Sequence, residues 1–185
     1  NTLDLAVDHV FWELDRNPWV VRNLLDTFVA EYSYVDEVKV YEGAWTPPGY
    51  DRQADPSQSP PAPDAAQLAR PYTLKPGGLS FCHDMGAHNN FSPKGRSSYE
   101  LANLTGCFSQ MTQEQLCNWV LVAACYVAKT RDLAWLGRSR DVVLACLRSM
   151  ANRGGEVGFA QYDSSRCVGG QEITTYDSLD HSLAQ

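Results

Sequence analysis

Residues 112–129 read TQEQLCNWVLVAACYVAK, a run that is apolar on nearly every side of a helix. Thr112 and Gln115 form a capping box at its start, and Met111 and Leu116 can pack together as the accompanying hydrophobic staple. A helix without a wide polar face is buried on most sides. The sequence therefore predicts a buried helix over this run.

Three further helical patterns surround it. The first follows directly, from about residue 131 to residue 152, and Gly154 and Gly155 end it. Upstream, residues 3–14 and residues 18–32 carry apolar side chains at helical spacing. Because very short links join the members of each pair, we expect two antiparallel helical hairpins.

The predominance of helical patterns predicts an all-α fold. Alternation of apolar and polar residues is never convincing over more than a few positions, although residues 79–81 could be short and extended. Helical hairpins joined by long loops are typical of a helical toroid or solenoid, and the absence of an internal repeat disfavours a regular solenoid. We expect residues 1–185 to form part of one domain.

The stretch from Tyr41 to Pro76 interrupts the helical pattern. Prolines crowd it together with Gly, Ser, Asp and Ala. Such a composition buries too little apolar surface to order itself fully. We expect residues 41–76 to be a surface loop or insertion within the helical domain.

Composition excludes several classes of function. The net charge is −7 and no basic stripe is visible, so we expect no nucleic-acid partner. No apolar run is long enough to span a bilayer, so we expect no membrane partner either. The six cysteines show no Cys-x-x-Cys pair and no zinc-ligand spacing, and we interpret them as reduced structural thiols. We expect no metal and no cofactor.

The stretch that is most informative about chemistry lies near the C-terminal end of the sequence. Residues 173–180 read ITTYDSLD and follow the glycine-rich turn at Gly169 and Gly170. Asp177 is a carboxylic acid at a loop-to-helix junction, among hydroxyls and apolar groups, where it can be held protonated as a general acid. The alternative is a simple helix N-cap, because Thr, Ser and Asp are preferred there anyway.

Two other polar clusters lie upstream. His83 and Asp84 sit in an apolar setting and could read the hydroxyls of a small polar ligand, or simply be a buried, hydrogen-bonded pair. Asp4 and Asp8 share one helix face with Trp12. That face is either solvated or a sugar-facing stripe with Trp12 as a stacking platform.

These clusters belong to five stretches that together closely resemble glycoside hydrolase family fifty-two, the retaining β-xylosidases. The resemblance covers nearly the whole chain except the stretch from Tyr41 to Pro76. The five stretches are NTLDLAVDHVFWEL (1–14), FCHDMG (81–86), RSSYELAN (96–103), MTQEQL (111–116) and ITTYDSLD (173–180).

The resemblance implies a longer protein, called the parent polypeptide below, with an N-terminal β-sandwich and a C-terminal (α/α)6 barrel. This chain would be the early part of the barrel, and by itself it should be inactive. The resemblance makes Asp177 the general acid/base, and it places the nucleophilic Glu a few residues before Asn1. We accordingly interpret the chain as an internal piece.

A related family of the same clan, with β-glucosidases and glucosylceramidases, is similar at the same motifs. There the His-Asp pair contacts the sugar, and a Thr two residues before the acid lies near it. Carried over by motif, these sugar-binding residues are His83, Asp84 and Thr175, with Asp4 beside the catalytic pair. His181 stands where an aliphatic residue is expected.

The expected activity is release of xylose from small xylo-oligosaccharides or aryl β-xylosides. We expect a cytoplasmic enzyme whose parent polypeptide is a homodimer. One alternative is a β-glucosidase on the same scaffold. The other, for the isolated chain, is a non-catalytic helical module that binds sugar or protein.

Overall fold

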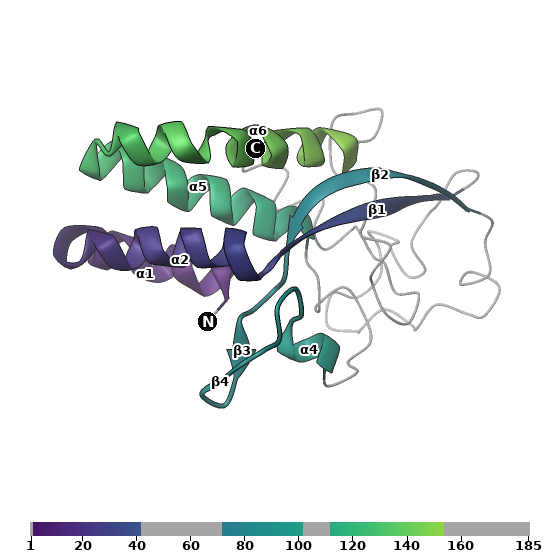
Figure 1. Cartoon of the computed structure of the whole chain (residues 1–185), viewed down its shortest axis with the longest axis horizontal. Helices are drawn as coiled ribbons and strands as arrows, with labels where there is room; N and C mark the ends of the chain where they lie inside the picture. The colour runs from purple at the N-terminus through teal and green to yellow at the C-terminus, as the bar shows by residue number, and fades with distance from the viewer. Residues whose placement is uncertain (1, 42–71, 102–111, 154–185) are drawn as a thin grey trace, which may run out of the picture.

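The computed structural model describes residues 2–41, 72–101 and 112–153. Within these ranges, two long helical hairpins lie one above the other, and a long β-hairpin curves out past one end of the helices (Figure 1). A small second β-hairpin and a single-turn helix lie below that end. The elements are α1 (Leu3–Arg16), α2 (Pro18–Glu31), β1 (Ser33–Tyr41), β2 (Tyr72–Phe81), β3 (Gly86–Ala87), β4 (Asn90–Phe91), α4 (Ser98–Leu101), α5 (Thr112–Thr130) and α6 (Leu133–Arg153).

The four long helices confirm the helices predicted from apolar spacing. Thr2 caps α1 by accepting a hydrogen bond from the Leu5 amide at 3.3 Å. The Asn17 amide donates to Glu13 O at 2.7 Å and ends α1, and Pro18 then opens α2 at a position that needs no amide hydrogen. Each pair runs antiparallel, as expected from its short link (Figure 1).

Helix α5 is the centre of the core, as its apolar sequence predicts. It packs against α1, α2, α6 and β2. The fully buried Trp119 stacks on Phe81 at a centroid distance of 5.7 Å and lies 6.2 Å from Trp135. Its indole N–H donates to Leu25 O at 3.2 Å, which satisfies the one polar atom of the ring. These contacts join α2, β2, α5 and α6 into one core.

The β1–β2 hairpin differs from the expectation that strands stay within a few residues, and that expectation is wrong. The two strands pair antiparallel over nine and ten residues, from Ser33 opposite Phe81 to Tyr41 opposite Tyr72. The sequence conceals β1 because its burial is inverted: Asp36 is buried whereas Val35 is 80% exposed. Both ends of the proline-rich stretch are therefore strand, and its residues 42–71 lie outside the described ranges.

A buried ion pair fixes this hairpin to α6. Arg153 Nη2 lies 2.6 Å from Asp36 Oδ1, and both side chains are fully buried. The Ser80 hydroxyl bonds both partners, at 2.6 Å from Arg153 Nη2 and 3.2 Å from Asp36 Oδ1. Gly77 leaves room for this cluster, because a Cβ there would lie 2.5 Å from Asp36 Oδ1. The pair holds β2 in the position from which the next residues enter the candidate site.

The described part of the chain is mostly helical, which agrees with an all-α fragment that carries this added hairpin. The closed (α/α)6 barrel stays a prediction. None of the helices described is both long and apolar enough to cross a membrane.

Candidate active site

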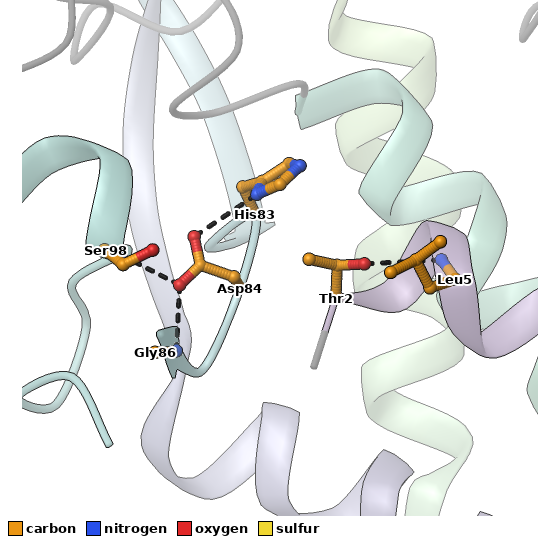
Figure 2. A network of polar contacts seen from close by, with 6 residues as sticks. All are labelled: Thr2, Leu5, His83, Asp84, Gly86 and Ser98. Atoms are coloured by element: carbon orange, nitrogen blue, oxygen red, sulfur yellow. Dashed lines mark hydrogen bonds and ion pairs between the residues drawn. The ribbon is translucent and has the colours of Figure 1, made fainter. Parts of the chain in front are cut away.

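The start of α1 and the loop after β2 meet at one end of the helical layers. Thr2 and Asp84 form an isolated antiparallel β-bridge. The Cys82 amide donates to Tyr32 O at 2.8 Å and fixes the loop where it leaves β2. Figure 2 shows Thr2, at the head of α1, facing the loop that carries His83 and Asp84. Two motifs far apart in sequence therefore lie side by side.

Asp84 is the organising residue of this loop. Its Oδ1 accepts hydrogen bonds from the Gly86 amide and the Ser98 amide, both at 2.8 Å, and its Oδ2 lies 3.2 Å from His83 Nδ1 (Figure 2). Burial alone raises the pKa of this carboxyl, but the hydrogen bonds from His83, Ser98 and Gly86 outweigh it and hold the pKa below its usual range. Asp84 is therefore a carboxylate at neutral pH.

The carboxylate orients His83. Because Asp84 can only accept, the His83 Nδ1 carries the hydrogen, and the Nε2 edge of the ring is turned away from Asp84 (Figure 2). Both side chains are almost fully buried. A carboxylate bonded to one ring nitrogen in this way fixes both the tautomer and the orientation of the imidazole.

This pair lies inside the part of the chain that matches known enzymes. The model of glycosyl hydrolase family 52 matches residues 1–50 and 62–126. A beta-xylosidase from Geobacillus stearothermophilus is 44% identical over 190 residues, which cover 100% of this chain and 23% of that protein. A second beta-xylosidase from the same organism is 42% identical over 177 residues, which cover 93% of this chain and 24% of that protein. The chain belongs to glycosyl hydrolase family 52. It spans about a quarter of the length of these relatives.

Asp4 reaches the same end of the family 52 chain on the first turn of α1. Its position suits a carboxylate, since the amides at a helix N-terminus favour negative charge. Its Oδ1 is buried and has no hydrogen-bond partner in the described structure. A buried carboxylate oxygen without a donor is costly unless a ligand or water supplies one. Asp4 therefore stays a candidate for sugar binding.

The rest of the proposed acidic stripe looks solvated in this chain. Asp8 is exposed, and Trp12 is 65% exposed with the Arg16 guanidinium 5.2 Å from its ring centroid. That arrangement occupies one face of the indole with a cation rather than with a sugar. Asp8 and Trp12 are therefore solvent-exposed, whereas Asp4, on the same helix face, has a buried carboxylate oxygen.

Gln115 is a buried polar residue for which the sequence predicted no functional role. It lies in the first turn of α5 and is fully buried, and neither atom of its amide has a hydrogen-bond partner among the residues described. The sequence assigned Gln115 to a capping box with Thr112, and that prediction is wrong because the Gln115 side chain makes no such hydrogen bond. No sequence signal distinguished Gln115 from Gln113 and Asn118, the other amide residues of this helix start.

The proposed acid and its neighbours lie outside the described residues. Thr175, Asp177 and His181 all belong to residues 154–185, so their roles stay predictions.

Within the described ranges, no group of three His, Cys, Asp or Glu side chains could hold a metal ion. Among the cysteines, burial raises the pKa of the Cys146 thiol to about 12, so this side chain acts as an apolar core residue.

Proposed function

We propose that the parent polypeptide is a retaining β-xylosidase that releases xylose from short xylo-oligosaccharides and aryl β-xylosides. The observation that carries this proposal is the similarity of 93–100% of the chain to two proteins named beta-xylosidase, through the region that contains the His83–Asp84 pair. The proposal extends the activity of relatives four times as long to a protein of which this chain is one part.

The proposed mechanism is a double displacement. A Glu that the family resemblance places before Asn1 attacks the anomeric carbon, while Asp177 donates its proton to the oxygen of the leaving group. Asp177 then removes a proton from the water that attacks the xylosyl-enzyme, and xylose leaves with its β configuration retained. The acid requires a raised pKa, for which burial and the nearby Glu carboxylate are the physical causes.

We assign His83, Asp84, Asp4 and Thr175 to binding of the sugar that is cleaved off. The geometry of Asp84 supports this, because its three donors fix a charged group beside the imidazole. His83 would meet a sugar hydroxyl through the ring edge turned away from Asp84. The buried Oδ1 of Asp4 would accept a hydrogen bond from another sugar hydroxyl. A site that hydrogen-bonds a sugar hydroxyl in this way binds an analogue without that hydroxyl much more weakly, because the analogue leaves a buried polar group of the protein unsatisfied.

The test is to follow hydrolysis of an aryl β-xyloside by the parent polypeptide with NMR. We expect β-xylose as the first product, before mutarotation. First appearance of α-xylose would contradict the retaining mechanism. The competing function, β-glucosidase activity, predicts that the aryl β-glucoside has a kcat/KM equal to or above that of the xyloside.

A further inference from the structure

A ligand-sized hollow lies directly after the His83–Asp84 pair in the sequence. Met85–Phe91, which include the β3–β4 hairpin, line a hollow of about 490 Å³. The Gly86 amide that opens the hairpin is one of the donors to Asp84 Oδ1. The same carboxylate therefore orients the imidazole on one side and fixes the edge of the hollow on the other.

The hairpin is held in one conformation from both of its ends. The Tyr32 hydroxyl lies 3.1 Å from both Met85 O and Ser92 O, and the Ser92 amide donates to Met85 O at 2.9 Å. Gly86 must be glycine, because its φ is +134° and a Cβ there would lie 2.0 Å from Asn90 O. A surface fixed in this way is already organised to receive a ligand.

The turn itself adopts an uncommon backbone. His88 and Asn89 have φ values of 53° and 61°, in the left-handed region that residues other than glycine seldom adopt. Asn accepts this region more readily than most side chains, whereas His88 does so at a cost. The result is a two-residue turn that sends the chain straight back along β4.

The side chains on this turn suit a neutral sugar. Phe91 is 82% exposed, and the neighbouring side chains of the hairpin tip carry amides and an imidazole, all of them exposed. An aromatic face packs against the C–H groups of a sugar ring, while amides both donate to and accept from its hydroxyls. Among the described residues, no carboxylate or ammonium lines the hollow, so these side chains favour an uncharged ligand. A single exposed Phe is ordinary on a protein surface. Phe91, however, lies in a hollow with a polar rim whose edge is fixed by Asp84, and such an apolar group among polar neighbours indicates a binding surface.

We propose that the β3–β4 hairpin binds the leaving-group sugar of the substrate, with Phe91 as the stacking platform and Asn89 as a hydroxyl-binding group. This inference rests on the proposed glycosidase function and adds to it the part of the substrate that this hairpin recognises. It requires the cleaved xylose to lie on the His83 side of the loop and the leaving sugar on the Phe91 side.

The test compares two substrates that differ only in the leaving group. Xylobiose releases a sugar, whereas β-xylosyl fluoride releases fluoride and cannot touch a leaving-sugar site. In the parent polypeptide, Phe91→Ala should lower kcat/KM for xylobiose by about tenfold, the size of one good stacking contact. It should leave kcat/KM for β-xylosyl fluoride within about twofold. Phe11→Ala is the matched control, because Phe11 is also exposed, at 70%, but lies on α1.

A second variant tests the amide without relying on Phe91. Asn89→Gly keeps a residue that accepts the left-handed backbone and removes only the side chain. It should also lower activity on xylobiose and spare the fluoride. Equal losses on both substrates, or no loss on either, would overturn the proposal. If the unsubstituted parent hydrolysed neither substrate, the proposed function itself would fail.

Discussion

Replacing Asp84 with Asn tests the role of its carboxylate in holding the site together. The amide is nearly isosteric, so its oxygen can still accept from the Gly86 and Ser98 amides. Its NH2 group would then face His83 Nδ1, which already carries the hydrogen in the native pair. The imidazole must move its hydrogen to Nε2, and this reverses what the outward ring edge offers to a ligand.

The expected cost follows from the three hydrogen bonds. Bonds to a charged group contribute about 1.5–3 kcal/mol each and neutral ones about 0.5–1.5 kcal/mol, so the three bonds together lose roughly 3–4 kcal/mol. Part of this is recovered, because a neutral amide costs less to bury than a carboxylate. We expect Asp84→Asn to lower the free energy of unfolding by about 1–3 kcal/mol.

The stability that the Asp84 carboxylate contributes should decrease in acid. Folding lowers the pKa of Asp84, so in acid the unfolded chain binds more protons at this group than the folded chain does. The stabilisation is complete above the unfolded pKa of about 3.9 and is lost as the pH falls through the lower folded value. The difference between the native protein and Asp84→Asn should therefore be constant from about pH 6 to pH 8 and shrink below about pH 4.

The assay is urea unfolding followed by tryptophan fluorescence, since Trp119 and Trp135 are both buried in the core. Asp8→Asn is the matched control, because Asp8 lies exposed on α1. It should leave the unfolding midpoint unchanged at pH 7. If Asp84→Asn unfolded at the native midpoint across the whole pH range, the Asp84 carboxylate would not be the group that organises the loop.

Two further predictions concern the joint between the β1–β2 hairpin and α6. Arg153→Met leaves the Asp36 carboxylate buried without its cation and should cost about 3–5 kcal/mol in urea unfolding, whereas Asp36→Leu combined with Arg153→Met should cost less. A single and a double variant of equal stability would contradict this coupling. Gly78→Ala combines a φ of +101° with a Cβ 2.4 Å from Ser149 Oγ, whereas Gly95→Ala has a φ of +70° and open space. Thermal unfolding should show the larger loss for Gly78→Ala, and a Ser149→Ala background should reduce it; equal losses would argue against the contact.

The helices could be predicted because their signals are local. Apolar spacing, the Thr2 cap and the proline at position 18 each act within about one turn, and the structure has all four helices within a few residues of the predicted ranges. The β1–β2 hairpin could not be predicted in the same way. Burial of Asp36 depends on Arg153, which lies 117 residues further along the chain. Pro76 and the two glycines after it also make β2 read as a turn.

In the candidate site, too, contacts between neighbouring residues could be predicted and contacts between distant segments could not. The His83–Asp84 bond joins neighbouring residues, so the sequence alone could suggest it. The β-bridge from Thr2 to Asp84 joins distant segments, and only the family resemblance brought their motifs together in advance. The clamp from Tyr32 onto the β3–β4 hairpin had no sequence signal, because a tyrosine at a helix end has many possible partners.

The central claim is that Asp177 supplies the proton in a retaining cleavage, and one variant of the parent polypeptide tests it most directly. Asp177→Asn should lower kcat/KM for xylobiose by roughly 10²–10⁴-fold, because that leaving group needs a proton. An activated aryl β-xyloside should lose much less in the first step, so the xylosyl-enzyme accumulates. Added azide should speed its breakdown and yield β-xylosyl azide, since an anionic nucleophile needs no general base. Cleavage of xylobiose by Asp177→Asn at the native rate, with no azide product, would contradict the assignment.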